Sequence, residues 1–446
     1  MQTTFDTLGL SPATLRAVRA LGFTAPTPVQ AAAIPPALLG KDVLASAQTG
    51  TGKTAAFGLP LIERLAALPR KKTRALILAP TRELAAQIAS HLAALAQGSN
   101  LRVAAIYGGV GFGGQVAAFA RGTEIIVATP GRLLDLIGQG SARLGDVELL
   151  VLDEADRMLD MGFLPTVKRI VGVLPQPRQT LFFSATIAPE ILKLTRDLLH
   201  DPVRVEMTPP SAAKTAAGIT HTAYTVPQQS KTDLLVELLK DNNIFSVIAF
   251  TRTKARANRL ALALEKHNVP AERIHGDRSQ AQRTRALADF KRGKLRVLVA
   301  TDVAARGIDI ADLGHVVNFD VPMAPEDYVH RVGRTARAEA TGDAITFVSH
   351  EEERLFRDIE KVVGRRIDRS KLPALPIPQA VPQPAPRGQH ARPGDAMPRG
   401  QQSRHGDTTP RGQQSRPGVH PPARKPQHAA FDGGARRSTA GKRRGR

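Results

Sequence analysis

The sequence predicts an α/β protein with two parallel-sheet domains in tandem, a short linker between them, and a disordered basic tail. Short apolar runs rich in β-branched residues alternate with helix-like stretches in two successive series. Continuous apolar strands separated by helices are typical of parallel sheets that are covered on both faces. At 446 residues the chain is also too long for a single ordinary core.

Eleven runs are the candidate strands. The first series comprises 43–45, 75–78, 103–106, 125–128, 149–152 and 180–183, and the second 247–250, 273–275, 297–300, 316–319 and 344–348. A stretch of small residues that contains two prolines lies between the series and suits an interdomain linker. We therefore expect a first domain over 1–207, a linker over 208–217 and a second domain over 218–369.

The segment 370–446 is rich in Pro, Gly, Arg and Gln, and it contains one Phe, Phe431, and no Tyr or Trp. Such a composition cannot bury a core, so the segment is predicted to be disordered. It repeats Pro-Arg-Gly-Gln with a 12-residue spacing at Pro386, Pro398 and Pro410. Two functions stay open for it: a solubilising tail, or a sequence-tolerant nucleic-acid tether that works by phosphate attraction.

Composition limits the function classes. The formal net charge is +22, which favours a polyanionic partner, with nucleic acid ahead of membrane. The chain has no Cys, which excludes disulfides and Cys-based zinc sites. No signal-peptide pattern and no run of 18 apolar residues is evident, so a soluble, cytoplasmic protein without membrane contact is expected.

An acidic tetrapeptide at 153–156 directly follows the apolar run 149–152. Buried carboxylates are costly without a cation, and Mg²⁺ prefers one or two carboxylates plus substrate phosphates. Asp153 is therefore a candidate Mg²⁺ ligand, and Glu154 is a candidate for positioning or deprotonating the attacking water. The structural alternative is a helix N-cap near Arg157, which would explain only one of the carboxylates.

A glycine-containing segment supplies the phosphate side of the same site. Glycines allow backbone N–H groups to approach phosphate oxygens, a Lys reaches the terminal phosphates, and a hydroxyl contributes to Mg²⁺. The candidates run from 47 to 54: Ala47, Gln48, Thr49, Gly50, Thr51, Gly52, Lys53 and Thr54. Ala47 departs from the general fingerprint, and a plain glycine turn before a helix is the alternative. Together with the acidic turn, the segment predicts a site for a nucleotide and Mg²⁺; the nucleotide is identified as ATP only by the resemblance that follows.

These motifs resemble those of the DEAD-box RNA helicases of superfamily 2, over about residues 5–369. The resemblance implies two tandem RecA-like domains, and the family's phosphate loop also begins with Ala. It further implies an adenine-binding motif in which an isolated aromatic stacks on the base and a Gln amide reads its edge. The matching residues are Phe5, Phe23, Thr27 and Gln30.

The resemblance also assigns residues outside the phosphate loop. Ser184 and Thr186 match hydroxyls that bond the last acidic residue, Asp156, and couple hydrolysis to strand separation. Arg334 and Arg337 match arginine fingers for the γ-phosphate. His330 matches their interdomain network, and Gly307 and Asp309 match the ribose site. From spacing alone, Arg331, Arg334 and Arg337 are expected on one side of a helical turn, with a solvated nucleic-acid-binding face as the alternative.

Further matched segments are expected to grip the sugar-phosphate backbone of RNA, including its 2′-hydroxyls. They comprise Pro80, Thr81, Arg82, Gly108, Gly109, Thr129, Pro130, Gly131 and Arg132 in the first domain, and Thr251, Arg252, Gly276, Gln280, Arg283, Thr301 and Asp302 in the second. With 3 Tyr, 15 Phe and no Trp, no aromatic platform is evident. Sequence-tolerant backbone recognition is therefore expected.

The expected function is that of an ATP-dependent RNA helicase, an ATP hydrolase that unwinds short duplexes or remodels RNA–protein complexes as two domains close. Two alternatives remain: an ATP-gated RNA clamp that seldom unwinds, or a DNA-directed translocase. Within the family, 316–322 through Ala338 and the Arg-rich tail look most like the bacterial RhlE group. A monomer acting in ribosome biogenesis or with RNA-decay machinery is what this resemblance suggests.

Overall fold

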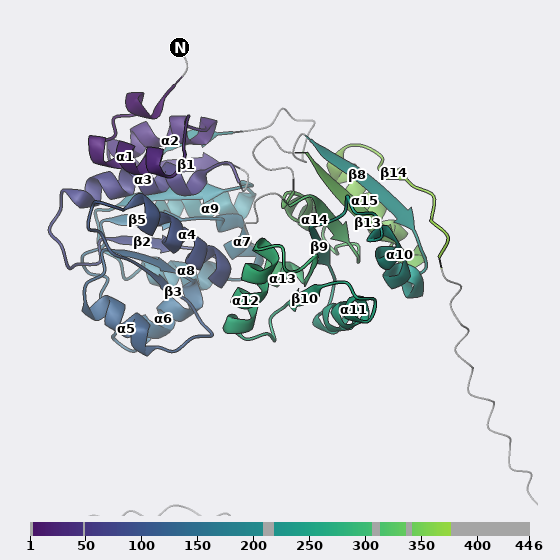
Figure 1. The fold of residues 1–446 in the computed structure, drawn as a ribbon. Coiled ribbons are helices and arrows are strands. Elements are labelled where there is room, and N and C mark those ends of the chain that lie inside the picture. The colour runs from purple at the N-terminus through teal and green to yellow at the C-terminus, as the bar shows by residue number, and fades with distance from the viewer. Residues whose placement is uncertain (1–2, 48–49, 208–217, 306–312, 336–340, 376–446) are drawn as a thin grey trace, which may run out of the picture. The chain divides into compact units, whose positions relative to one another are not determined.

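The computed structural model describes residues 3–47, 50–207, 218–305, 313–335 and 341–375. The described residues belong to one compact unit, and the segment 380–446 lies outside them. The predicted linker 208–217 also lies outside them. Two seven-stranded sheets organise the described part (Figure 1). The predicted α/β class, with two tandem RecA-like domains, is confirmed.

The first sheet is parallel throughout and has the order β3-β4-β2-β5-β6-β1-β7. Its strands are β1 (Val43–Ser46), β2 (Ala75–Leu78), β3 (Val103–Ile106), β4 (Ile125–Ala128), β5 (Leu149–Leu152), β6 (Gln179–Ser184) and β7 (Val203–Glu206). Six were predicted. The missed strand, β7, pairs only with β1, and two of its four residues are charged, so it lacks the apolar run of an inner strand.

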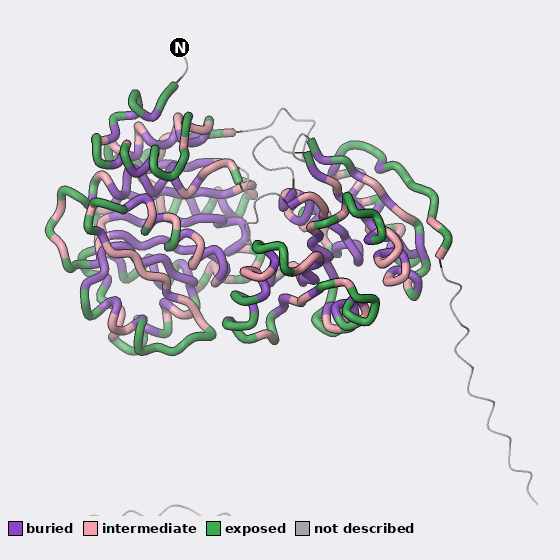
Figure 2. Tube along the Cα trace, viewed as in Figure 1, coloured by how far each residue is buried: buried purple, intermediate pink, exposed green. Residues whose placement is uncertain are grey.

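Helices cover both faces of this sheet. They are α1 (Pro12–Ala20), α2 (Pro28–Leu38), α3 (Lys53–Ala66), α4 (Arg82–Leu95), α5 (Gly113–Ala120), α6 (Pro130–Gly138), α7 (Ala155–Asp160), α8 (Leu164–Val171) and α9 (Pro189–Leu198), with a 3-10 turn η1 (Phe5–Thr7). Two hydrophobic clusters lie on the two faces, because alternate strand residues such as Ile77 and Leu78 belong to different clusters. Figure 2 shows the strands as the buried centre of this region.

The second sheet repeats the plan, also with parallel pairs only, in the order β10-β11-β9-β12-β13-β8-β14. Its strands are β8 (Ile219–Thr225), β9 (Val247–Phe250), β10 (Ala271–Ile274), β11 (Val297–Ala300), β12 (His315–Asn318), β13 (Gly342–Val348) and β14 (Asp368–Arg369). The sequence missed β8 and β14. β8 alternates buried and more exposed residues, and β14 has only two residues, so neither shows a continuous apolar run.

The helices of the second sheet are α10 (Lys231–Leu238), α11 (Lys254–Lys266), α12 (Gln280–Lys291), α13 (Asp302–Ala305), α14 (Pro325–Val332) and α15 (Glu353–Val363), with 3-10 turns η2 (Gln228–Ser230) and η3 (His350–Glu352). The ordered chain continues past Arg369, where the sequence placed the start of the tail. Ser370 N–H donates to Ala223 O (2.8 Å), and Leu375 packs against the core.

Because all pairs in each sheet are parallel, the carboxyl ends of the strands share one edge. In the first sheet these ends lead into the segments that the sequence singled out, at 47–54, 80–82, 107–109, 129–132, 153–156 and 184–186. In the second they lead into 251–252, 275–276 and 301–302. Among the helices of the described residues, none combines the length and apolarity needed to cross a membrane.

Candidate nucleotide site and nucleic-acid interface

The phosphate loop ends at the N-terminus of α3, where backbone N–H groups have no partner inside the helix. Gly50 and Gly52 both have φ +86°, a left-handed conformation that favours glycine. Lys53 is buried; its Nζ donates to Ala47 O (3.1 Å) and lies 3.9 Å from Asp153 Oδ1. Strand β5 and helix α3 thus bring the predicted cation and the predicted metal ligand together.

Gln30 braces this loop from α2. Thr27 and Gln30 form a capping box at the start of that helix, and Gln30 Oε1 accepts from Thr27 N–H (2.9 Å). Gln30 Nε2 donates to Gly52 O (3.1 Å), and Thr27 Oγ1 donates to Thr51 O (2.8 Å). A Cβ on Gly52 would stand 2.3 Å from Gln30 Nε2, so any other residue would displace the Gln30 amide as well as strain the left-handed backbone. Sequence alone missed this bracing role.

The two predicted aromatics of the adenine motif contact each other. Phe5 is buried, and its ring stacks on Phe23 with 6.3 Å between centroids. Phe23 in turn makes an edge contact with the His91 ring on α4. Phe5 is therefore a core residue in this structure, and the adenine role given to it stays a prediction.

Asp153 and Glu154 are both 3% exposed, at the end of β5. Burial raises the pKa of Asp153 to about 6, although Lys53 opposes the shift. Burial would also raise the pKa of Glu154, but the positive charges of Arg157, Lys53 and Arg334 outweigh it and hold that pKa below its ordinary value. Glu154 is thus an ionised carboxylate, and Asp153 lacks full cationic compensation.

Glu154 adopts φ +53°, and helix α7 begins at Ala155, close to the start near Arg157 that the capping alternative required. Its N-cap position is Glu154, which makes no side-chain cap bond, so the structural alternative of a capping carboxylate is wrong for this residue. A left-handed conformation in a non-glycine residue costs about 1–3 kcal/mol and is concentrated at functional sites. The Glu154 carboxylate pairs with Arg157.

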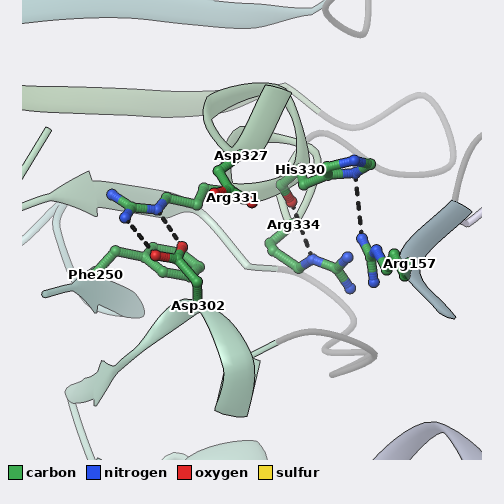
Figure 3. Close-up of a pocket in the computed structure, with 7 residues that line it drawn as sticks. All are labelled: Arg157, Phe250, Asp302, Asp327, His330, Arg331 and Arg334. Carbon is green, nitrogen blue, oxygen red and sulfur yellow. Dashed lines mark hydrogen bonds and ion pairs between the residues drawn. The ribbon is translucent and has the colours of Figure 1, made fainter. Parts of the chain in front are cut away.

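Arg157 is the residue that sequence reasoning missed. It is 1% exposed, and its Nη1 donates to Glu154 Oε2 at 2.8 Å. Its Nη2 donates to His330 Nδ1 at 3.3 Å, a contact drawn in Figure 3. Burial, followed by the charge of Arg157, lowers the pKa of His330 to about 4, so the imidazole is neutral and can accept. Sequence offered a weak signal at most, because a lone Arg in a first helical turn is ordinary.

Asp156 is held against the segment after β6. Its Oδ2 accepts from the backbone N–H groups of Ala185 (3.0 Å) and Thr186 (2.8 Å) and from the Thr186 hydroxyl (3.1 Å). Ser184 takes a different part, because its Oγ accepts from Asp156 N–H (3.3 Å) and donates to Thr186 O (2.7 Å). The three predicted coupling residues therefore lie together.

The expectation that three arginines share one side of a helical turn is wrong. Helix α14 ends at Val332, and Arg331 is 2% exposed and turned into the second domain. Its Nε and Nη2 bond both oxygens of Asp302 (2.5 and 2.7 Å), while its guanidinium lies over the Phe250 ring (Figure 3). Arg334 Nε instead donates to His330 O (3.2 Å). Arg331 is thus a structural residue of the second domain.

In the first domain, the predicted RNA contacts lie at the edge formed by strand ends. Thr81 and Thr129 are the N-cap residues of α4 and α6, but only the Thr81 side chain caps its helix, accepting from Leu84 N–H (3.2 Å). The Arg82 guanidinium lies against Gly108 and Gly109, and an added Cβ on Gly109 would collide with it. The remaining predicted residues, Pro80, Pro130, Gly131 and Arg132, begin or flank the same helices.

In the second domain, several predicted RNA contacts already have protein partners. Arg252 bonds Glu352 (2.8 Å), and Asp302 bonds Arg331. Gln280 Nε2 and Arg283 Nη2 both bond the Glu83 carboxylate, at 3.1 and 2.8 Å. Thr251 and Thr301 are buried at strand ends, and Gly276 lies beside Lys254. Their RNA roles stay predictions.

Five predicted residues lie outside the described part of the chain: Gln48, Thr49, Gly307, Asp309 and Arg337. The predicted residues that are described include Thr54, at the second position of α3. They place a lysine, two buried carboxylates and the N-terminal backbone N–H groups of α3 at one edge of the sheet. Fold and site together define a nucleotide-hydrolysing protein of the two-domain helicase class.

Comparison with known proteins specifies the family. Residues 27–194 match the family described as DEAD/DEAH box helicase, and 230–339 match the helicase conserved C-terminal domain. The DEAD-box ATP-dependent RNA helicase CshA of Bacillus subtilis (strain 168) is 44% identical over 375 residues, which cover 84% of this chain and 75% of that protein. CshA of Geobacillus kaustophilus (strain HTA426) is 44% identical over 373 residues, covering 84% and 79%.

Two solved structures are similar in fold and sequence. S. cerevisiae Dbp5 bound to RNA and ADP BeF3 is 32% identical with a TM-score of 0.74, over 82% of this chain and 95% of that one. Mss116p bound to ssRNA and AMP-PNP is 28% identical with a TM-score of 0.77, over 84% and 80%. The chain belongs to the DEAD-box family of ATP-dependent RNA helicases. It is an ATP-hydrolysing enzyme that acts on RNA.

Proposed function

We propose that this helicase locally unwinds or remodels short RNA duplexes and RNA–protein complexes, with hydrolysis at the β5 edge described above. The observation that carries the proposal is the buried set of Lys53, Asp153 and Glu154, one cation and two carboxylates of unlike pKa. Lys53 contacts the terminal phosphates, and Glu154, ionised at neutral pH, orients or deprotonates the attacking water. Gln30 and the loop glycines hold the nucleotide in place.

Mg²⁺ fits the chemistry of this set. No group of three or more metal-ligating His, Cys, Asp or Glu side chains exists among the described residues, so protein groups alone form no cage. Mg²⁺ usually takes one or two carboxylates and completes its shell with water and nucleotide phosphates. Asp153 and Thr54 would hold it, and the raised pKa of Asp153 is the mark of a carboxylate short of positive charge. When bound, the ion would neutralise charge on the phosphates.

The second domain contributes cationic groups to the same chemistry, and residues of the first domain couple it to RNA. Arg334 and Arg337 stabilise negative charge as the terminal phosphoryl group leaves, and His330 orients them, with Gly307 and Asp309 at the ribose. Asp156, Ser184 and Thr186 couple the nucleotide to the RNA surface, which is supported by four bonds between the acidic turn and the segment after β6.

RNA is bound through its backbone at the two strand edges, in keeping with relatives whose structures carry RNA or ssRNA. We also propose the finer features that the resemblance suggests: domain boundaries at 207 and 218, a monomer in the cytoplasm, an RhlE-like subgroup, and ribosomal precursors or RNA-decay machinery as partners. The tail beyond residue 375 would add affinity by charge.

Glu154→Gln tests this proposal, because it keeps the side-chain shape and removes the charge. We expect normal binding of ATP and of single-stranded RNA, and a loss of RNA-stimulated hydrolysis of about 100-fold or more, the scale of a missing general base. Glu148→Gln, a half-exposed carboxylate just before β5, is the matched control and should hydrolyse ATP normally. Full activity in the Glu154 variant would refute the assignment, and a strand-displacement assay of the wild type separates unwinding from clamping.

A further inference from the structure

The loop between β3 and α5, residues 107–112, exposes two apolar side chains. Val110 is 40% exposed and Phe112 39%. Apart from Phe245, Phe112 is the only phenylalanine among the described residues with so much of its surface open. Leaving 39% of this residue exposed forfeits part of the free energy of burying its ring, which is about 1.5–3 kcal/mol for full burial. The position of this ring therefore calls for a reason.

Helix stability does not supply that reason. Phe112 is the N-cap residue of α5, and it makes no side-chain cap bond. Ser, Thr, Asp or Asn at an N-cap accept a bond from the first turn, which phenylalanine cannot do. The core does not supply it either, because neither hydrophobic cluster of the first domain includes this residue. Phe112 thus occupies a polar position with an apolar ring.

Two arginines expected to bind RNA flank the loop. On one side the Arg82 guanidinium lies against Gly108 and Gly109. On the other, the Arg132 guanidinium lies over the Phe112 ring, 4.0 Å from its centroid, and Nη1 donates to Val110 O at 3.0 Å. Helix α5, which follows the loop, and helix α6, which contains Arg132, lie at the lower left of Figure 1. One cationic group therefore packs on the ring, and a second lies against the glycines of the same loop.

We propose that Phe112 is a stacking platform for a base of the bound single-stranded RNA. One face of the ring is taken by Arg132, and the exposed remainder offers a π surface to a base, while Arg82 and Arg132 attract the adjoining phosphates. Base–aromatic stacking is tolerant of sequence because every base has a π face. A ring held by a cation loses little freedom on binding. This inference rests on the proposed RNA-binding surface and adds base contact to backbone contact.

Binding of two matched oligonucleotides tests it: a single-stranded RNA of about ten uridines, and the same strand with abasic sugars, which keeps the phosphates and removes the bases. Phe112→Ala should weaken binding of the uridine strand about 10-fold, the scale of one lost stack. It should leave binding of the abasic strand unchanged. Phe112→Trp should bind the uridine strand at least as tightly as wild type, and Phe112→Leu should fall between the two.

Phe245→Ala is the matched control, because Phe245 is 64% exposed but precedes β9, at the opposite end of that strand from Thr251. It should bind both strands like the wild type. Equal weakening of both strands by Phe112→Ala, or no weakening of either, would overturn the stacking role. Failure of the wild type to bind either strand would instead refute the proposed RNA surface. A circular dichroism spectrum unchanged in every Phe112 variant verifies that the variants are folded.

Discussion

Replacing Arg157 with methionine isolates the charge that keeps Glu154 ionised. Methionine has a similar length and no charge, so the fully buried space stays filled while the 2.8 Å ion pair and the bond to His330 are lost. Breaking a buried pair by removing one partner costs about 3–5 kcal/mol, because the other charge is left buried. Lys53 and Arg334 still act on Glu154, so we expect the lower end, about 3 kcal/mol of unfolding free energy.

The same change should be visible in the pH dependence of hydrolysis. The pKa of Glu154 now lies below its ordinary value; without the charge of Arg157, one of the groups that lower it, that pKa rises. A carboxylate that must be ionised for activity then loses its proton only at higher pH. The acid limb of RNA-stimulated ATP hydrolysis should therefore move to higher pH in Arg157→Met.

Urea unfolding and an ATPase profile between pH 5 and 9 measure these two effects. Lys72→Met is the matched control, because the Lys72–Asp146 pair is about half exposed on both sides, and such pairs contribute about 1 kcal/mol or less. An acid limb that stays in place in Arg157→Met, together with a stability loss no larger than in the control, would refute the role assigned to Arg157.

Two further substitutions test other parts of the structure. Burial raises the pKa of Asp153 from 3.8 to about 6. Between these two pH values the folded protein without nucleotide binds a proton that the unfolded chain has released. The free energy of unfolding therefore falls as pH rises from 3.8 to about 6. Asp153→Asn should abolish this fall and stabilise the nucleotide-free protein at pH 7 by about 3 kcal/mol in urea unfolding; a less stable variant would contradict the shift. Arg331→Met should lower the unfolding free energy by about 3–5 kcal/mol, since it strands Asp302 and leaves Asn318 Oδ1 without its donor. A variant that keeps wild-type stability and loses only hydrolysis would contradict the structural role and indicate that Arg331 contacts the triphosphate.

The inner strands were predictable because each is an unbroken apolar run buried on both faces. Leu149–Leu152 and Val297–Ala300 are fully buried, and their apolar sequences alone predict them as strands. The edge strands β7 and β14 and the half-exposed β8 carry no such run. Their assignment depends on a neighbouring strand that offers free backbone groups, and that neighbour is distant in sequence.

The phosphate loop and acidic turn were predictable for a different reason: their chemistry is local. A Gly-Lys-Thr block and a cluster of carboxylates each indicate a function within a few residues. The ends of parallel strands bring the two to the same edge of the sheet. Arg331 shows the limit of such reasoning. Its spacing from Arg334 suggested that both lie on one face of a helix. Helix α14 ends at Val332, however, and the Arg331 guanidinium bonds Asp302 and Asn318 inside the second domain.

The sequence by itself determined the α/β class, the repeated sheet plan and the residues of a nucleotide site, because these depend on apolar patterning and on short motifs. Tertiary structure alone decided which charges meet. Lys53 and Asp153 lie 3.9 Å apart although they are distant in the chain, and Gln30 reaches Gly52 because α2 packs beside α3. Phe112 became a candidate RNA contact only when its burial was known. Contacts between residues far apart in the chain depend on packing, and no local pattern encodes them.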